Sequence, residues 1–425
     1  MLGRDDSQSS KFARREARKL VEELGRLKGT YVKIGQMFAL LGEHFLPAVL
    51  TDALHELEAK TDPLGWSEIA PVLERNLGSR MSDLDIETEA FAAASLAQVH
   101  RAEVRKTGEQ ICLKIQYPGL GEVIDTDFDA VVRMLRLARW LPAGRDLDDW
   151  LESMRTYLHH EIDYGREAQI CREVWLRVES VQTQGALLHV PRLYDDYCTG
   201  QVLAMEYVPG KAVTETAIER LSLTRRTALA QSMLELFFYE LYDWGWLQTD
   251  PNFGNYLIRP GIKGVSDELV LLDFGSVLNC SEVFLYHLRH LIAAGLESDE
   301  EGVVQGLIGL GCLQQDASEE GRKLFADFCL NLLEPLRPAH TLPKERLNRR
   351  GQYCWGDSGL MRRAGRQAAK STTSGHFIPP SRDFALIARK LTGVFTFISV
   401  LDAQFNGYEV VMQHIDAWRE REAGG

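Results

Sequence analysis

The sequence predicts an α+β fold in which a helical N-terminal extension precedes a small mixed lobe and a larger helical lobe. Apolar residues recur at helical spacing near both ends of the chain, whereas the short alternating segments between them are typical of β-strands. A chain of 425 residues is long enough for two or three packed units. We expect the chain to divide into residues 1–84, 85–208 and 209–425.

The N-terminal extension is predicted to be helical. Residues 11–28 are charged and carry leucines at helical spacing. Residues 30–60 continue as helix, with a second helix after Pro47. Asp62-Pro63 then breaks the chain, and a third helix is expected from Ser67 to Asn76.

The small lobe combines strands with helices. Strands are expected around Phe91, Val99, Val104, Ile111–Ile115, Leu187–Leu193 and Val202–Tyr207. Residues 120–178 are expected to form two helices around a break at Pro142-Ala143-Gly144, and the second of them carries His159–Glu173.

The large lobe is predicted to be mostly helical. Its expected elements are a helix over Leu223–Trp244, a loop over Thr249–Gly254, a β-hairpin over Tyr256–Leu272, helices over 281–333, a loop-like basic segment over 355–382, and helices over 383–400 and 406–421.

Charge and cysteine usage exclude several classes of protein. The formal net charge is −13, which disfavours a general nucleic-acid binder, because backbone affinity comes from Lys and Arg. Residues 1–28 nevertheless hold eight Lys or Arg against five Asp or Glu, which favours a local contact with a partner or an anionic lipid surface. Seven scattered cysteines predict neither a zinc site nor disulfides and indicate a reducing compartment. We expect no secretory signal and no transmembrane helix.

Four residues occur in the order that phosphoryl transfer by a protein kinase requires. Lys114 stands in a strand-like segment, Asp250 is followed five residues later by Asn255, and Asp273-Phe274-Gly275 comes next. Such a lysine neutralises nucleotide phosphates, while amide and carboxylate oxygens hold Mg²⁺. We therefore expect ATP or ADP at Lys114, Mg²⁺ at Asn255 and Asp273, and Asp250 as the catalytic base for a water or a substrate hydroxyl.

Two departures separate the sequence from ordinary protein kinases. An alanine-rich segment replaces the glycine-rich phosphate loop, and its candidate nucleotide-binding residues are Ala92, Ala93, Ala94, Ser95, Leu96, Ala97, Gln98 and Val99. Alanine still presents main-chain N–H groups, but its Cβ hinders close approach of the main chain to a ligand. We therefore expect this segment to bind phosphate in a different geometry. Gln248-Thr249-Asp250 stands where H-R-D is usual. Both differences disfavour phosphorylation of proteins.

These motifs resemble those of the UbiB/AarF-domain (ADCK) atypical kinase family over about residues 25–280. The matching blocks are Lys33-Ile34-Gly35-Gln36 (K-x-G-Q), the alanine-rich loop, Glu161-Ile162-Asp163 followed by Glu167 (E-x-D), Lys114–Gly119, Gln248–Asn252 and Asp273-Phe274-Gly275. Residues Arg389–Gly393 are similar to a helix near the family's C-terminus. The resemblance implies an atypical protein-kinase-like bilobal fold.

Lys114 is expected to pair with a helix carboxylate that serves catalysis. Glu161 and Glu167 are the two candidates, and their spacing of six residues does not decide between them. Main-chain groups near Glu206 and Val208 are expected to meet adenine, because this segment lies where the hinge between the lobes should be.

The K-x-G-Q segment is expected to regulate the site. In the family that it resembles, this segment folds over the cleft where a protein substrate would bind. Lys33, Gly35 and Gln36 would then lie near the E-x-D carboxylates, which include Asp163. This implication favours a small-molecule substrate or ATP hydrolysis over protein phosphorylation.

Three hypotheses follow for function. The resemblance implies an Mg²⁺-dependent atypical kinase or ATPase that supports isoprenoid-quinone (ubiquinone) biosynthesis or lipid homeostasis. The second is a nucleotide-gated module that binds or chaperones a lipid or quinone precursor with negligible catalysis; intact Asp250, Asn255 and Asp273 argue against it. The third, an ordinary protein kinase, is disfavoured. Expected partners are nucleotide, a lipid or quinone precursor and enzymes of quinone biosynthesis, but not nucleic acid.

Membrane contact is a separate expectation. The basic helix at 11–28 and the basic loop at 362–370 offer about 1 kcal/mol per well-placed Lys or Arg toward anionic lipid. The alternative, which the sequence supports equally, is that both basic segments are solvent-exposed surfaces with no lipid contact. Attachment would be peripheral and weakened by salt. The expected location is the cytoplasm, with peripheral attachment to the inner face of the membrane.

Overall fold

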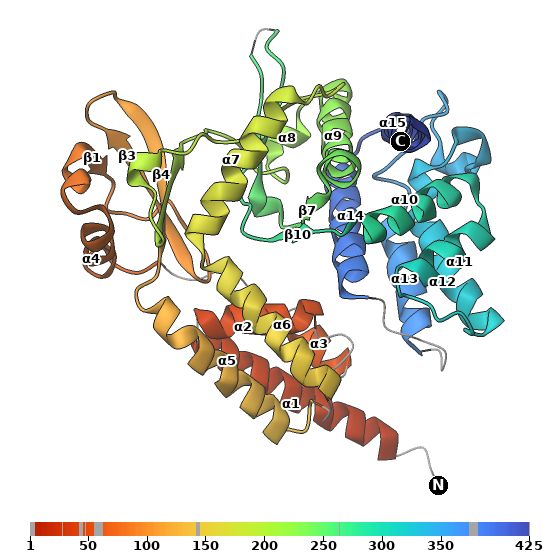
Figure 1. Cartoon of the computed structure of the whole chain (residues 1–425), viewed down its shortest axis with the longest axis horizontal. Coiled ribbons are helices and arrows are strands. Elements are labelled where there is room, and N and C mark those ends of the chain that lie inside the picture. The colour runs from red at the N-terminus through yellow and green to blue at the C-terminus, as the bar shows by residue number, and fades with distance from the viewer. Residues whose placement is uncertain are drawn as a thin grey trace. The chain divides into compact units, whose positions relative to one another are not determined.

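Helices and strands follow one another in nearly the predicted order (Figure 1). The computed structural model describes residues 5–27, 29–41, 46, 48–54, 63–141, 145–262, 264–373 and 381–424. The helices are α1 (Asp5–Leu27), α2 (Thr30–Leu41), α3 (Ala48–Leu54), α4 (Trp66–Leu77), α5 (Leu120–Leu137), α6 (Arg145–Glu161), α7 (Tyr164–Ser180), α8 (Thr216–Glu219), α9 (Leu223–Phe238), α10 (Glu282–Glu297), α11 (Glu300–Gly309), α12 (Glu319–Leu332), α13 (Leu360–Thr373), α14 (Arg382–Val400) and α15 (Gly407–Gly424). The strands are β1 (Leu84–Ile86), β2 (Ala92–Ala93), β3 (Ala97–Val104), β4 (Glu109–Gln116), β5 (Leu187–His189), β6 (Val202–Glu206), β7 (Trp246–Gln248), β8 (Tyr256–Arg259), β9 (Glu268–Leu271) and β10 (Val277–Asn279).

The chain forms two compact units. The first comprises Met1–Glu173 and Arg192–Tyr207, and the second comprises Val174–Pro191 and Val208–Gly425. Helix α7 begins in the first unit and ends in the second. The chain returns to the first unit at Arg192 and passes into the second unit again between Tyr207 and Val208.

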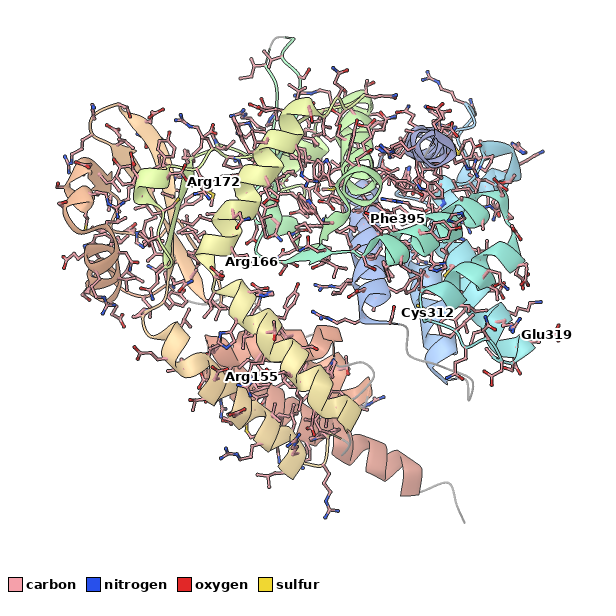
Figure 2. The ribbon with its side chains drawn as sticks, in the orientation of Figure 1. Arg155, Arg166, Arg172, Cys312, Glu319 and Phe395 are labelled. Atoms are coloured by element: carbon pink, nitrogen blue, oxygen red, sulfur yellow. The ribbon has the colours of Figure 1, made fainter. Side chains whose placement is uncertain are left out.

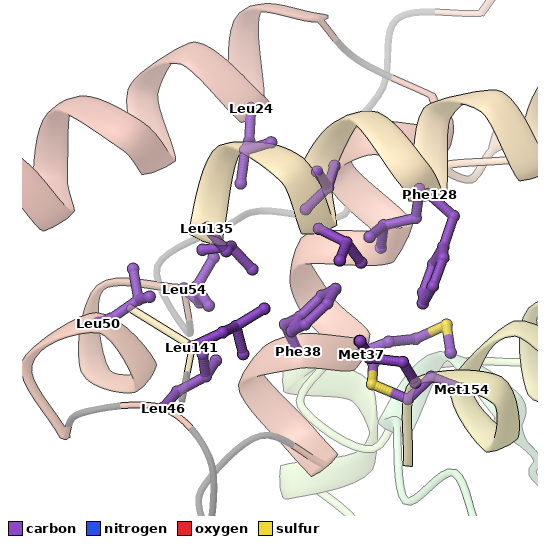
Figure 3. Packing of buried hydrophobic residues seen from close by; sticks show 14 of the residues in the cluster. Leu24, Met37, Phe38, Leu46, Leu50, Leu54, Phe128, Leu135, Leu141 and Met154 are labelled. Carbon is purple, nitrogen blue, oxygen red and sulfur yellow. The ribbon is translucent and has the colours of Figure 1, made fainter. Parts of the chain in front are cut away.

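The helices of the first unit share a hydrophobic core. Their buried side chains include Leu24 of α1, Phe38 of α2, Leu50 of α3 and Phe128 of α5 (Figure 3). The ring of Phe38 stacks against Phe128 at 6.1 Å and meets Trp150 of α6 edge-on at 5.5 Å. Each fully buried side chain of this size contributes about 1.5–3 kcal/mol, so this core is what fixes α2 and its K-x-G-Q residues.

An antiparallel sheet forms the rest of the first unit, in the order β1-β3-β4-β6 with β2 paired to β3. Successive side chains of a strand point to opposite faces. Ile111, Leu113 and Ile115 of β4 are buried in a cluster with α4. Cys112 and Lys114 therefore lie on the other face, where Tyr164 of α7 packs against Leu203 of β6.

The second unit is mainly helical around two small sheets. Strand β7 pairs with β10, while β8 and β9 form the predicted hairpin, to which β5 adds as a parallel strand. Helix α14 packs against α9. The last turn of the predicted helix 223–244 is π-helical, over Tyr239–Trp244. A π-helical turn often marks a functional position, and this one directly precedes β7 and Asp250.

Two predictions about helices were wrong. The segment 355–382 was expected to be a loop, but it contains α13. Arg363 of α13 donates two hydrogen bonds to Glu334, at 2.5 and 2.6 Å, and Tyr353 Oη donates a third at 2.8 Å. This distant carboxylate anchors the helix, and local sequence does not reveal it. Residues 145–180 form two helices instead of one, because Asp163 begins a new helix.

Some sequence predictions fall on residues outside the described ranges. These are Lys28, Pro47, Asp62, the break at 142–144 and the side chain of Lys370. Within the described parts of the chain, no helix has both the length and the apolar character needed to span a bilayer.

Candidate functional site

Lys114 pairs with Glu167, which settles the choice left open by the sequence. Its Nζ donates to both carboxylate oxygens of Glu167, at 2.7 and 2.9 Å. Glu167 is only 3% exposed, whereas 20% of the Lys114 side chain remains exposed. Lys114 Nζ also lies 5.2 Å from the ring centroid of Tyr164. A buried carboxylate thus holds a lysine whose own side chain is only partly buried.

The position of Glu167 follows from the start of α7. Asp163 Oδ1 accepts a hydrogen bond from Arg166 N at 3.0 Å, and Asp163 O accepts one from Glu167 N. Asp163 thereby caps the helix, as Asp commonly does. Arg166 and Arg172 extend from α7 in Figure 2. The sequence did contain this signal, because an Asp immediately before a helical run is typical of an N-cap.

Glu161 pairs with the lysine of the K-x-G-Q motif. Lys33 Nζ lies 2.9 Å from Glu161 Oε1, and the two side chains are 20% and 18% exposed. Gly35 is buried and Gln36 is half-buried on the same helix, α2. The helix break at Asp163 places the two glutamates on different helices, so each one meets a different lysine.

The alanine-rich segment forms a tight hairpin. Strand β2 pairs with β3, and Ala94 N donates to Ala97 O at 2.8 Å across the turn. Ala92 and Ala94 are exposed and Ala93 is half-buried, whereas Ser95, Leu96 and Ala97 are buried. Val99 pairs in register with Lys114 and shares its face of the sheet.

Gln98 lies apart from the other residues of this segment. Its side chain is fully buried on the opposite face from Lys114. Gln98 Oε1 accepts from Leu64 N at 2.8 Å, Nε2 donates to Leu64 O at 3.2 Å, and His100 Nε2 lies 2.8 Å away. The side chain ties β3 to the segment that precedes α4 and is therefore not available to a nucleotide.

Glu206 and Val208 stand at the end of β6, where the chain leaves the first unit. Glu206 N donates to Arg192 O at 2.8 Å, and Tyr207 N donates to Gln110 O at 3.1 Å. Glu206 is the last residue of β6, in the first unit, and Val208 begins the second stretch of the second unit. The expected hinge therefore coincides with a change of unit.

Asp250 and Asn255 are joined within one loop of the second unit. Asn255 Nδ2 donates to Asp250 Oδ2 at 3.0 Å and to Asp250 O at 3.3 Å, and Asn252 N donates to Asp250 Oδ1 at 3.3 Å. Asn255 therefore directs its amide nitrogen to Asp250. Its remaining side-chain polar atom is an oxygen, the kind of ligand that Mg²⁺ prefers.

Main-chain hydrogen bonds link this loop to Asp273. Leu272 N donates to Asn255 O, and Thr249 N donates to Ser276 O, both at 2.9 Å. Asp273 Oδ1 accepts from Gly275 N at 2.8 Å and is half-buried. The second unit thus brings Asp250, Asn255 and Asp273 together on two joined loops. The described residues contain no group of three or more His, Cys, Asp or Glu fit to hold a metal.

Helix α14 contacts both ends of the Asp250 loop through Lys390, whose Nζ donates to Gln248 Oε1 and Tyr256 Oη, and no sequence pattern predicted this contact. Lys390 is 1% exposed and lies 4.0 Å from the carboxylate of Glu240 in the π-helical turn. Burial raises the pKa of Glu240 to about 7, although the positive charge of Lys390 acts to lower it. Burial opposes the charged form of Lys390 as well, yet Glu240 and Tyr256 hold the pKa of this lysine above its ordinary value. No local pattern marks a contact between such distant segments.

Comparison with known proteins identifies a matching family. Residues 56–307 match the model of the ABC1 atypical kinase-like domain. A relative named "Probable serine/threonine-protein kinase abkA" from Dictyostelium discoideum is 26% identical, over 94% of this chain and 70% of its own length. "Atypical kinase COQ8, mitochondrial" from Saccharomyces cerevisiae is 27% identical, over 75% of this chain and 62% of its own length. The chain thus spans roughly two thirds of these relatives.

A solved structure shares the fold. It is described as the complex structure of Rv3197-erythromycin from Mycobacterium tuberculosis, and it superposes with a TM-score of 0.63 at 21% identity. The match covers 96% of this chain and 98% of that one. The predicted α+β, kinase-like fold is therefore confirmed.

Proposed function

The chain belongs to the ABC1 atypical kinase-like domain family, and from that premise we propose that it is an ATP-binding, Mg²⁺-dependent atypical kinase or ATPase. The pair between Lys114 and Glu167 is the observation that carries the proposal. A lysine held by a helix carboxylate is a required part of kinase phosphoryl transfer. Burying an ion pair costs desolvation free energy, so such a pair adds little to the stability of the fold. The presence of this pair is therefore better explained by function than by stability.

Asn255 and Asp273 would hold the Mg²⁺ of the bound nucleotide. They offer one amide and one carboxylate group on loops joined by main-chain hydrogen bonds. Mg²⁺ is usually bound by one or two protein groups together with substrate phosphates, so this small set fits the ion. When bound, the metal would neutralise charge on the phosphates. Asp250 would orient the attacking water or hydroxyl.

The substrate is proposed to be a small molecule or water. The chain lacks the glycine-rich loop and the H-R-D motif of ordinary protein kinases. Resemblance to the UbiB/AarF-domain family, together with relatives named atypical kinase COQ8, supports a role in ubiquinone biosynthesis or lipid homeostasis. Partners would include an isoprenoid-quinone or lipid precursor and enzymes of that pathway.

A peripheral position at the inner face of the membrane is part of the proposal. Helix α1 buries Ala17, Val21 and Leu24 in the core of the first unit, whereas Arg14 and Arg15 are exposed. The basic side chains are therefore available to anionic lipid headgroups.

The test is nucleotide-dependent thermal stabilisation combined with ATP turnover. Ligand that binds the folded state at about 100 times its Kd stabilises it by about 2.7 kcal/mol. We expect Mg·ATP to raise the Tm of the wild type, Asp273→Asn to lose most of this shift, and the exposed control Asp316→Asn to keep it. Turnover should require Mg²⁺ and be measured with and without anionic vesicles. A Mg²⁺-dependent shift without turnover under any condition would favour the nucleotide-gated binding module instead.

A further inference from the structure

The loop that carries Asp250 contains no cation of its own. From Gly245 to Ile258 the sequence has neither Lys nor Arg. In the proposed function, negative charge develops on the phosphoryl group beside Asp250, and enzymes stabilise such charge with positioned cations. A cationic side chain near Asp250 must therefore come from another part of the chain.

Helix α14 brings a guanidinium to this loop. Arg389 Nη2 lies 3.7 Å from Asp250 Oδ1. The two side chains are 31% and 35% exposed, so both remain accessible to a ligand in solution. A guanidinium stays charged at every physiological pH and matches the geometry of carboxylate and phosphate groups.

The next residue of α14 fixes the helix to both ends of the loop. Lys390 is fully buried, and its Nζ donates to Gln248 Oε1 and to Tyr256 Oη, each at 2.7 Å. Tyr256 Oη also donates to Gln248 Oε1 at 3.2 Å. Gln248 precedes Asp250 in the chain and Tyr256 follows Asn255, so one ammonium group closes the loop at its base.

Close packing continues along the same face of α14. A Cβ placed on Gly393 would lie 2.1 Å from Pro251 Cβ, so the helix touches the residue next to Asp250. The ring of Phe397 meets Phe253 at 5.7 Å and Tyr256 at 5.9 Å. Positions 390, 393 and 397 share one helical stripe.

Another face of α14 is also held. Phe395, which Figure 2 labels, is fully buried, and its ring lies 5.2 Å from that of Trp355. A helix packed on two faces cannot shift without breaking one of these contacts, so the place of Arg389 relative to Asp250 is defined.

We propose that Arg389 is a positioning residue of the phosphoryl-transfer centre: its guanidinium supplies the positive charge that the loop lacks at the Asp250 carboxylate and so holds that carboxylate toward the attacking group. The Lys390, Gly393 and Phe397 contacts are the support that places it. This inference rests on the proposed function and extends it to a residue far from the kinase-like motifs.

The experiment compares steady-state ATP turnover of Arg389→Gln, Arg389→Lys and the wild-type full-length chain. We expect Arg389→Gln to lower kcat on the order of tenfold to a hundredfold, since small misplacements of a reacting group have effects of this size. KM for ATP and the nucleotide-dependent Tm shift should change less than about twofold, because Arg389 is not proposed to bind the ground state. Arg389→Lys should recover a large part of kcat, because it keeps the charge.

The matched control is Arg382→Gln, which removes an exposed charge from the same helix. Equal kcat values for Arg389→Gln and Arg382→Gln would overturn the inference and leave the proposed function standing. A parallel fall in Tm and in nucleotide affinity in both Arg389 variants would assign a structural role and would also overturn it. A wild type without turnover in any nucleotide or vesicle condition would refute the proposed function itself, and the inference with it.

Discussion

At the scale of single residues, two lysine–glutamate pairs organise the charged side chains of the first unit. Lys114 meets Glu167, and Lys33 meets Glu161. A helix carboxylate for Lys114 could be predicted because phosphoryl transfer requires one, and a position for Lys33 near the E-x-D carboxylates could be predicted from the family resemblance. Which glutamate meets which lysine could not, because the answer depends on a helix break at Asp163 and on the packing of α2 from another part of the chain.

Neutralising Glu167 should weaken nucleotide binding more than neutralising Glu161. Glu167→Gln loses the charge-assisted hydrogen bonds that orient Lys114, so we expect Mg·ATP affinity to fall about tenfold. Glu161→Gln leaves the pair at Lys114 intact and should change that affinity less than about twofold. Isothermal titration of folded samples provides the measurement. Equal losses in both variants would contradict the assignment of Glu167.

A buried carboxyl in α9 makes stability depend on pH. Glu235 is 3% exposed and accepts hydrogen bonds from Gln184 N at 3.2 and 3.3 Å, and burial raises its pKa to about 7. The folded state then binds more protons than the unfolded state between about pH 4.5 and 7, so this group lowers stability as pH rises through that window.

Replacing Glu235 should therefore stabilise the protein at high pH. Glutamine keeps an oxygen for the Gln184 N–H but carries no charge, so Glu235→Gln should gain about 1–3 kcal/mol over wild type at pH 8 and little at pH 5. Urea unfolding at both pH values measures the difference. The exposed control Glu179→Gln should show no such pH dependence. A gain of equal size at both pH values would mean that ionisation is not the cause.

At the scale of elements, the sequence was most informative where local periodicity decides and least where distant contacts do. The β8–β9 hairpin, the sheet strands β3 and β4 and the helix pattern of the second unit were predicted because alternation and helical spacing are local signals. Helix α13 was missed because its anchor is Glu334, in another segment. The contact of α14 with the Asp250 loop was missed for the same reason.

Substitution of Gly393 should show how tightly α14 meets that loop. The added Cβ of Gly393→Ala would come within 2.1 Å of Pro251 Cβ, so the loop or helix must move. We expect a loss of about 1–3 kcal/mol, the usual range for overpacking. Gly365→Ala, in α13, is the control: its Cβ meets nothing within 4 Å, and helix propensity predicts a gain of about 0.5–1 kcal/mol. Thermal unfolding of both variants would reveal the opposite signs, and equal effects would show that the Pro251 contact is not limiting.

At the scale of the whole molecule, charge is distributed unevenly. The chain carries a net charge of −13, yet α1 exposes Arg14 and Arg15. Lys19 and Arg26 of this helix are partly neutralised by Glu16 and Glu23, at 3.0 and 2.7 Å. The composition alone could suggest a basic N-terminal segment. The structure adds that Ala17, Val21 and Leu24 are already buried in the part of α1 whose side chains are described, so attachment to lipid through this part of the helix would rely on its charged side chains.

Attachment through α1 should therefore be electrostatic and sensitive to salt. We expect flotation with vesicles of phosphatidylcholine and phosphatidylglycerol at low salt, and its loss as ionic strength rises toward about 0.5 M, because the Debye length then falls well below about 8 Å. Reversing both charges, Arg14→Glu with Arg15→Glu, should abolish binding, since each basic residue contributes about 1 kcal/mol near an anionic surface. The same reversal at the exposed Arg349 and Arg350 in the second unit changes net charge equally and should leave flotation intact. If both double variants lost binding alike, net charge would account for it and α1 would not be the contact; flotation that resisted salt would instead require an apolar anchor.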